Sequence, residues 1–420
     1  MRLQGDFYVE GDKSICHRLA LTSLIASGSI SLENFSTCQD VASSLESVRQ
    51  LGGKWKTEAG KLTLFGAERK VASGSHHINC GNSGTTTRFL MGLLSGIPGT
   101  FTLDGDDSLR KRPMERLAKV LREMGAEILC HHHCCPVVIK GKSLSGIDHT
   151  LQVASAQMKS ALILAGLQAD GMTAITEKVP SRDHTERLIK HLGGRLSKQG
   201  SQINVERSSL HLDGSFFVPG DVSSAAFFIG LAALLSGSHV TAKNVLINPT
   251  RLGFVDVLRR AGARLNISQK SDAIEPYGDI ECCYQGPLHS FEVSPEEVPF
   301  LIDEIPILTL VATQAKGVSR FRGIEELKYK ETDRAVGIKE ELNKMGAKIS
   351  IEEDTLVVSG PTELKAPAVL DSYKDHRLAM VLRLASVMVG NDLKFPRIKH
   401  ENMVAISYPK FFQTFEELLR

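Results

Sequence analysis

The chain has 420 residues, more than a single hydrophobic core usually serves, so we expect two domains of about 200 residues each. Its 50 basic and 48 acidic residues give a net charge of +2 without a long basic run, which excludes a general nucleic-acid binder. The segment Met1–Asp6 lacks the apolar core of a signal peptide, and Ala225–Leu235 is too short to cross a bilayer. We therefore expect a cytoplasmic protein with no membrane partner and no nucleic-acid partner.

A pattern that repeats after about 70 residues is written six times along the chain. Each copy is predicted to begin with a polar cap and an apolar helix that ends at glycine, and a short β-like run follows. A second, amphipathic helix then ends in five copies at Gly-Gly or Gly-Ala, where a left-handed residue suits glycine. Alternating residues such as 348–351 and 355–359 predict a closing hairpin. The six predicted first helices are 14–28, 83–96, 155–166, 223–237, 303–317 and 375–390.

Six βαβαββ units predict an α/β protein whose sheets and parallel helices build each domain. Three copies precede the Pro-Gly-Asp turn at 219–221, which is our first candidate for a crossing between domains, and residues 11–13 are the second. We expect an N-terminal domain of residues 12–220 and a C-terminal domain of residues 1–11 plus 221–420. Parallel helices would also add their partial positive charges over one surface, which favours anions.

The most concentrated polar cluster is Lys330-Glu331-Thr332-Asp333-Arg334, just before an apolar helical pattern that runs through Ile338, Leu342 and Met345. Asp333 or Thr332 could cap this helix, and free backbone N–H groups at its start favour an anionic ligand. A capped helix whose charges are merely solvated is the alternative.

Other helix entrances carry hydroxyls, amides and cations, the groups that bind phosphate or carboxylate. Asp303 is a carboxylate among many cations, which suits a general base, while a plain helix cap is the alternative. By contrast, we expect no metal at residues 130–135, a Cys/His-rich hairpin turn, because neighbouring residues on a strand point to opposite sides. The entrances are Lys13, Ser14 and Arg18; residues 82–88; residues 108–113; Ser155, Ala156, Gln157 and Lys159; residues 181–184; and residues 375–377.

Taken together, these segments resemble the family of 5-enolpyruvylshikimate-3-phosphate synthases, also called 3-phosphoshikimate 1-carboxyvinyltransferases. The resemblance covers nearly the whole chain. It implies a two-domain inside-out α/β barrel of six βαβαββ repeats, in which the N-terminal domain mainly binds shikimate 3-phosphate. The motifs that carry it are residues 12–18, 82–88, 112–114, 155–157, 330–334 and 375–377.

The resemblance also implies the reaction, in which the enolpyruvyl group of phosphoenolpyruvate moves to the 5-hydroxyl of shikimate 3-phosphate, on the route to chorismate. Asp303 would take the hydroxyl proton, and Glu331 or Lys13 would protonate the methylene carbon. Neither metal nor organic cofactor is implied, and a monomer is expected. Shikimate 3-phosphate would be held by Lys13, Ser14, Arg18, Ser155, Ala156, Gln157, Arg182, Asp303 and Lys330, and phosphoenolpyruvate by Lys13, Gly84, Arg112, Gln157, Arg334 and Arg377.

Three positions depart from some members of the family and indicate its second branch. Ser108 and Ile406 stand where those members have arginine and lysine, and Glu326 stands where they have asparagine. The triplet 155–157 is Ser-Ala-Gln rather than Ser-Ser-Gln. Because Gly84 is retained, we expect glyphosate, a phosphoenolpyruvate-like inhibitor, to fit.

Two alternatives are weighed against this interpretation. The sister enzyme that uses UDP-N-acetylglucosamine has a cysteine in the loop corresponding to residues 104–113, where this chain has none, and it has Lys-Asn where this chain has Lys13-Ser14. A DNA clamp built from α/β repeats needs a basic inner face and shows strongly salt-dependent binding, which the balanced charge disfavours.

Overall fold

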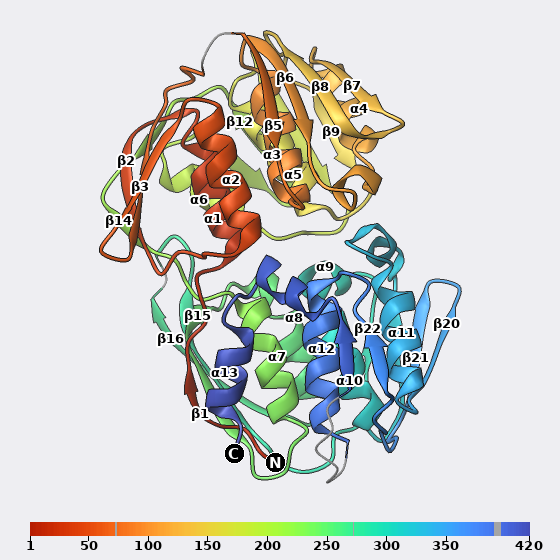
Figure 1. The fold of residues 1–420 in the computed structure, drawn as a ribbon. Coiled ribbons are helices and arrows are strands. Elements are labelled where there is room, and N and C mark those ends of the chain that lie inside the picture. Colours follow the sequence, from red (N-terminus) through yellow and green to blue (C-terminus); the bar gives the residue numbers. More distant parts are fainter. Residues whose placement is uncertain (72–73, 272, 390–395) are drawn as a thin grey trace. The chain divides into compact units, whose positions relative to one another are not determined.

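The computed structural model describes residues 1–71, 74–271, 273–389 and 396–420 (Figure 1). The chain forms two compact units, which we name the N-terminal unit (Gly11–Val218) and the C-terminal unit (Met1–Glu10 with Pro219–Arg420). None of the helices in the described part of the chain combines the length and apolar character that a membrane crossing requires.

The described residues of the N-terminal unit form three mixed sheets, each with an antiparallel hairpin at one edge. In one of them β5 pairs in parallel with β6, while β8 pairs antiparallel with both β6 and β7. The strands are β2 (Ala26–Glu33), β3 (Lys54–Glu58), β4 (Lys61–Phe65), β5 (Ser75–Asn79), β6 (Gly99–Asp104), β7 (Glu127–His131), β8 (Cys134–Gly141), β9 (Asp148–Leu151), β10 (Met172–Glu177), β11 (Leu196–Gln199), β12 (Gln202–Glu206), β13 (Leu210–Leu212) and β14 (Ser215–Phe217). The helices are α1 (Lys13–Thr22), α2 (Gln39–Gln50), α3 (Gly84–Ser95), α4 (Glu115–Glu123), α5 (Ala156–Gly166) and α6 (His184–His191).

The C-terminal unit repeats this arrangement in two four-stranded sheets and ends with a parallel pair of strands. The strands are β1 (Gln4–Phe7), β15 (His239–Leu246), β16 (Arg264–Ser271), β17 (Tyr277–Cys283), β18 (Glu292–Val293), β19 (Gly317–Arg322), β20 (Lys348–Glu352), β21 (Thr355–Gly360), β22 (Val369–Asp371) and β23 (Arg397–Lys399). The helices are α7 (Val222–Ala232), α8 (Gly253–Arg260), α9 (Val298–Leu301), α10 (Ile305–Gln314), α11 (Arg334–Lys344), α12 (His376–Val387) and α13 (Phe411–Leu418).

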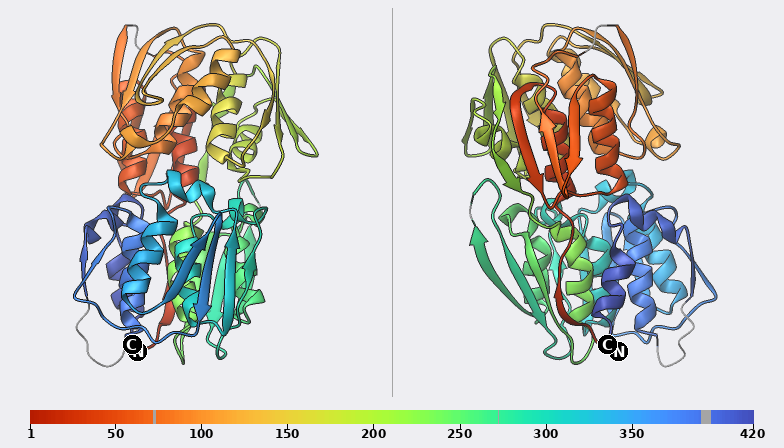
Figure 2. Two further views of the ribbon diagram at one scale, coloured as in Figure 1. Left: turned by 90° about the vertical axis from the view of Figure 1, so that its right-hand side faces the viewer. Right: turned by 60° about the vertical axis from the view of Figure 1, so that its left-hand side comes forward.

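The first helix of each repeat lies inside its unit, and the sheets lie outside. Helices α3 and α5 pack together and α3 also meets α1, while α7, α10 and α12 contact one another in the C-terminal unit (Figures 1 and 2). Their composition explains this placement, since every residue of α7 and almost every residue of α5 and α10 is buried. A helix that is apolar all round is stable only when it is surrounded by protein.

In each unit a sheet is completed by strands from a distant part of the chain, one in the C-terminal unit and two in the N-terminal unit. Strand β1 pairs in parallel with β15, and β13 and β14 pair in parallel with β2. Strand β1, which lies within the segment Met1–Glu10, thus belongs to the same sheet as β15.

The predicted glycine ends are right for the second helices and wrong for three of the first helices, α1, α7 and α10. Helix α10 ends at Gln314, and the predicted end, Gly317, is the first residue of β19. Gly52 and its four counterparts are left-handed, as expected. Helix α1 ends at Thr22 rather than Gly28, because the chain tightens into i→i−3 bonds and the Ser23 hydroxyl donates to the carbonyl of Ala20. Helix α7 likewise ends at Ala232, before the predicted Gly237. Gly390, the predicted end of the sixth first helix, lies outside the described residues.

Several predicted caps also differ from the observed ones. Asp12 rather than Ser14 caps α1 by accepting from Ile15 N, and Asp221 rather than Ser223 caps α7. Asp303 caps no helix, because α10 begins two residues later at Ile305. For α1 and α7, an aspartate just before the helix is the cap in place of the predicted serine. For α10, no side chain forms a cap hydrogen bond.

Candidate functional site

In the N-terminal unit, the entrance of α1 presents a lysine that is fixed by a carboxylate. Lys13 Nζ lies 2.8 Å from Asp40 Oδ2, and Asp40 comes from the first turn of α2. Both side chains are largely buried, at 16% and 10% exposed, so the ammonium is held in one place. Sequence reasoning missed Asp40, which lies 27 residues from Lys13 and has no local signal.

Arg18, one helical turn after Ser14, is held by neutral oxygens. Its guanidinium donates to the carbonyl of Ser14 at 2.8 Å, to the hydroxyl of Thr185 at 2.7 Å and to that of Ser160 at 3.0 Å. Its central carbon also lies 4.9 Å from the centre of the Phe89 ring. The oxygens that accept these three bonds are all neutral.

The entrance of α3 combines a capped helix start with two arginines. Ser83 caps the helix by accepting from Thr86 N. A Cβ added to Gly84 would lie only 2.7 Å from Arg88 Nη1 and 3.2 Å from Arg112 Nη1. Glycine at this position therefore lets two guanidinium groups approach the backbone closely.

Amide side chains orient these arginines. Arg112 Nη2 donates to Asn82 Oδ1 at 2.8 Å and to Ser108 Oγ at 3.2 Å. Arg88 Nη1 donates to Gln157 Oε1 at 2.7 Å, which links the entrance of α3 to that of α5.

The entrance of α5 has the predicted cap. Ser155 accepts from Met158 N, Ala156 is the first helical residue, and the side-chain amide of Gln157 donates to Thr85 Oγ1 at 3.0 Å. Arg182 follows in the loop before α6 and is half-buried. The structure thus joins the α3 and α5 entrances directly.

In the C-terminal unit, Arg334 is the centre of a cluster of charges. It is the first residue of α11, where Asp333 rather than Thr332 is the cap. Its guanidinium lies 2.5 Å from Glu331 Oε2, 2.8 Å from Asp375 Oδ2 and 3.1 Å from Asp303 Oδ1. Although burial alone would lower it, these three carboxylates hold the pKa of Arg334 well above its usual range.

Asp303 is surrounded by further cations. Its Oδ1 lies 3.5 Å from Arg377 Nε and 3.9 Å from Lys330 Nζ, and Arg377 Nη1 also donates to the Asp303 carbonyl at 3.1 Å. Lys330, Arg334 and Arg377 therefore gather around Asp303, and Glu331 joins this cluster through Arg334. This arrangement can hold an anion beside a group able to accept a proton.

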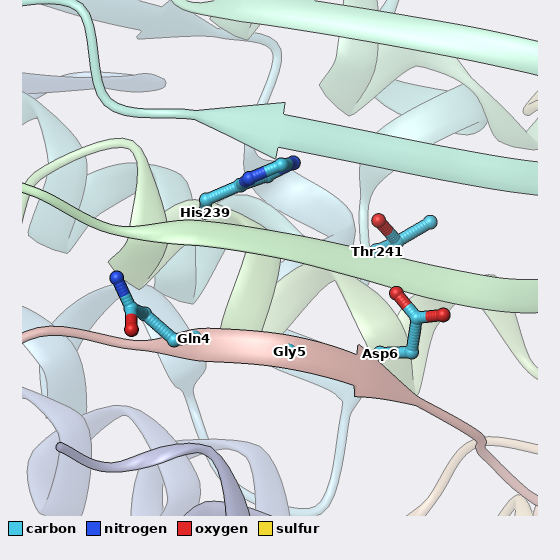
Figure 3. A pocket seen from close by; sticks show the side chains of 5 residues that line it. All are labelled: Gln4, Gly5, Asp6, His239 and Thr241. Atoms are coloured by element: carbon cyan, nitrogen blue, oxygen red, sulfur yellow. The ribbon is translucent and has the colours of Figure 1, made fainter.

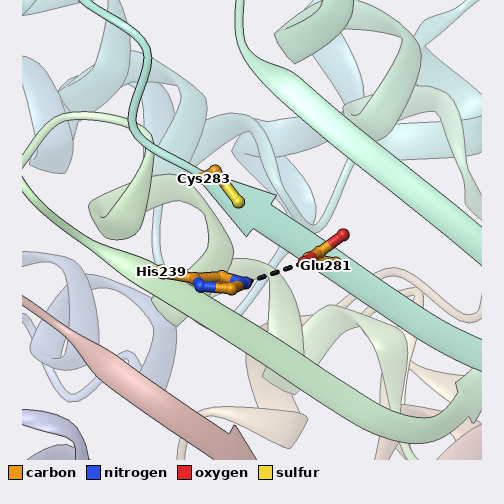
Figure 4. Close-up of side chains that lie close together, drawn as sticks. All are labelled: His239, Glu281 and Cys283. Atoms are coloured by element: carbon orange, nitrogen blue, oxygen red, sulfur yellow. Dashed lines mark hydrogen bonds and ion pairs between the residues drawn. The ribbon is translucent and has the colours of Figure 1, made fainter.

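Among the residues that the structure describes, two groups of side chains have ligand atoms close enough for a metal ion. In the first, Glu331, Asp375 and His376, the carboxylates already bind Arg334, so a metal would have to displace the guanidinium. The second, His239, Glu281 and Cys283, lies on the outer face of β15 and β17, where His239 Nε2 is 2.7 Å from Glu281 Oε1 (Figure 4). This pair is exposed, so hydrogen bonding at a sheet surface accounts for it.

A shallow polar depression of about 390 Å³ adjoins the second group. It is lined by Gln4, Gly5, Asp6, His239 and Thr241, at the edge where β1 meets β15 (Figure 3). None of the residues expected to bind substrate lines it.

The Cys/His-rich segment 130–135 is a hairpin turn between β7 and β8, as predicted.

Comparison with known proteins first defines the class. The fold matches that of the enolpyruvyl transferase NikO from Streptomyces tendae with a TM-score of 0.77 at 17% identity, over 99% of this chain and 95% of that one. The chain therefore has the enolpyruvyl transferase fold.

Closer similarities give the family. The model of EPSP synthase (3-phosphoshikimate 1-carboxyvinyltransferase) matches residues 1–415, and the chain belongs to this family. It is 39% identical to the 3-phosphoshikimate 1-carboxyvinyltransferase of Bacillus subtilis (strain 168), over 99% of this chain and 97% of that protein. The EPSP synthase of Acinetobacter baumannii has a TM-score of 0.84 at 34% identity, over 99% of this chain and 96% of that one.

Proposed function

We propose that this chain transfers the enolpyruvyl group of phosphoenolpyruvate to the 5-hydroxyl of shikimate 3-phosphate and releases phosphate. The reaction belongs to the shikimate pathway, which leads to chorismate and the aromatic amino acids. The observation that carries the proposal is the Asp303 cluster, in which a carboxylate that can act as base lies within 4 Å of Arg334, Arg377 and Lys330. The family to which the chain belongs supplies the identity of the substrates.

In this proposal the substrate ligands are the residues that the family resemblance implies. The planar guanidinium groups suit phosphate and carboxylate because they can bind two oxygens at once. Shikimate 3-phosphate binds to Lys13, Ser14, Arg18, Ser155, Ala156, Gln157, Arg182, Asp303 and Lys330, and phosphoenolpyruvate binds to Lys13, Gly84, Arg112, Gln157, Arg334 and Arg377.

Addition begins when Asp303 takes the proton from the 5-hydroxyl and the oxygen attacks the second carbon of phosphoenolpyruvate. The electron pair of the double bond moves to the methylene carbon, which receives a proton from Glu331 or Lys13. In the elimination the same carbon returns a proton to the group that supplied it, the double bond re-forms, and the bond to phosphate breaks. The proton on Asp303 leaves with the phosphate, so each group returns to its starting state.

The second branch of the family is supported by Ser108, Ile406 and Glu326. Neither serine nor isoleucine carries a positive charge, so these two positions offer no cation to phosphoenolpyruvate. Ser108 instead accepts a hydrogen bond from Arg112, and Ile406 is buried. Because Gly84 leaves Arg88 and Arg112 in place, glyphosate is proposed to fit the phosphoenolpyruvate site. We also propose that the protein is a monomer in the cytoplasm.

Phosphate release from the purified protein tests the reaction. Release should require both shikimate 3-phosphate and phosphoenolpyruvate, should not occur with UDP-N-acetylglucosamine as acceptor, and should be lost in Asp303→Ala. A glyphosate titration in the same assay tests the inhibitor. Equal release with both acceptors would overturn the assignment of shikimate 3-phosphate as the substrate. Full activity of Asp303→Ala would overturn the assignment of Asp303 as the base.

A further inference from the structure

A fully buried group of charges lies behind the entrances of α5 and α6. Lys159, on the second turn of α5, places its Nζ 3.0 Å from Glu177 Oε2 and 2.7 Å from Glu186 Oε1. The three side chains are 0%, 2% and 5% exposed, so all are out of contact with solvent. They come from α5, the end of β10 and the first turn of α6.

This group of charges forms hydrogen bonds with both the N–H and the carbonyl of Ser181, in the loop between β10 and α6. The N–H and hydroxyl of Ser181 both donate to Glu177 Oε1, at 3.1 and 2.5 Å. The carbonyl of Ser181 accepts from Lys159 Nζ at 3.3 Å. Because this carbonyl belongs to the peptide bond that leads into Arg182, Lys159 fixes the backbone from which the Arg182 side chain extends.

The residues next to the group of charges hold a second arginine. Ser160 follows Lys159, Thr185 precedes Glu186, and their hydroxyls lie 2.6 Å apart. Both hydroxyls accept from the guanidinium of Arg18. A shift of α6 against α5 would therefore move the hydrogen bonds of Arg18 as well as the loop that carries Arg182.

Stability alone is a poor account of these charges. Burying one ammonium and two carboxylates has a large desolvation cost, and apolar side chains of similar volume usually serve a core as well or better. Lys159, Glu177 and Ser181 are joined by hydrogen bonds, and Glu186 forms an ion pair with Lys159. Buried polar groups that are linked in this way can select one conformation of the segments that they join.

We propose that Lys159 is a positioning residue for the acceptor: through Glu177, Glu186 and Ser181 it sets the loop and helix start that present Arg182 and Arg18 to shikimate 3-phosphate. The inference rests on the proposed function, in which these two arginines bind shikimate 3-phosphate. Phosphoenolpyruvate, whose proposed ligands include neither arginine, should be unaffected by the group of charges.

The test uses the full-length protein and two variants of different severity. Ser181→Ala removes one hydroxyl bond and leaves every charge paired. The triple variant Lys159→Met, Glu177→Gln, Glu186→Gln removes the charges while keeping similar volumes, so that no buried charge is left alone. Thr414→Val, which loses the buried bond from the Tyr408 hydroxyl in the C-terminal unit, is the control for general destabilisation.

We expect the KM for shikimate 3-phosphate to rise a few-fold in Ser181→Ala and by about 10-fold in the triple variant, as the loss of one to two hydrogen bonds predicts. The KM for phosphoenolpyruvate should stay within about 2-fold of the wild type, and Thr414→Val should change neither constant while lowering the unfolding midpoint. An unchanged KM for shikimate 3-phosphate, or a parallel rise of both constants, would overturn the inference. Wild-type protein that releases no phosphate would instead refute the proposed function itself.

Discussion

Replacing Arg334 by methionine tests the cluster at the start of α11. The guanidinium is 2% exposed and bonds to Asp303, Glu331 and Asp375, of which Asp375 is fully buried. Removing one partner of a buried ion pair costs about 3–5 kcal/mol, because the other partner remains buried and unpaired. We expect a loss of this size at pH 7, since Asp303 keeps two other cations while Asp375 loses its guanidinium partner.

Urea unfolding followed by circular dichroism measures this loss, with the slope checked so that only the midpoint changes. Arg383→Met is the matched control: it lies on α12 of the same unit and pairs with Glu401 at 2.6 Å, and the two side chains are 15% and 25% exposed. This pair is less buried than Arg334 with Asp375, so its loss should cost less. Equal losses in the two variants would refute the view that Arg334 is the centre of the cluster. Phosphate release should also fall in Arg334→Met, because its proposed contact with phosphoenolpyruvate and its hold on Asp303 are both lost.

Three further predictions concern one residue each. In Gly84→Ala the new Cβ would lie 2.7 Å from Arg88 Nη1. Steady-state kinetics should therefore show the KM for phosphoenolpyruvate rising about 10-fold and glyphosate inhibiting less strongly. Unchanged constants would show that this contact does not disturb the phosphoenolpyruvate site. Burial raises the pKa of Asp279, but bonds from Lys243 and others outweigh it and lower the pKa from 3.8 to about 2, so stability that is present above pH 3.8 is lost as the pH falls towards 2. Asp279→Asn should therefore lose about 2 kcal/mol at pH 7 and match the wild type near pH 2 in urea titrations, and a constant difference would exclude this linkage. Burial lowers the pKa of His17 from 6.5 to about 3, so between these pH values the unfolded chain binds a proton that the folded chain does not bind. The free energy of unfolding of the wild type should therefore fall by up to about 4 kcal/mol between pH 6.5 and 3. His17→Gln should lack this pH dependence.

The sequence predicts the parts of the site that depend on local chemistry. The caps at Ser83, Ser155 and Asp375 lie at the positions expected from a polar residue before an apolar helix, and each is observed. Asp333 and Thr332 could not be separated from sequence, because both are good caps one residue apart. The backbone conformation decides for Asp333, which is extended and accepts from Val336 N.

Partners that come from distant segments could not be predicted. Arg18 bonds to Thr185, which lies 167 positions away, and Lys13 bonds to Asp40 on another helix. Nothing in the local pattern of either segment selects its partner, because tertiary packing brings the two helices together. Asp303 illustrates the same limit, since the cations that make it a candidate base come from α11, α12 and the segment that precedes α11.

The pairing of β1 with β15 has a consequence for the order of folding during synthesis. Strand β1 leaves the ribosome first, yet Leu3 donates its N–H to the hydroxyl of Ser238, which follows 235 positions later. The N-terminal unit is one continuous stretch between them and closes its last sheet with β13 and β14 at its own end. Since domains fold as units during synthesis and a long loop is entropically costly to close, this unit should fold first. Its folding then brings Gly11 and Val218 together and shortens the effective loop that β1 must close to reach its place in the second sheet.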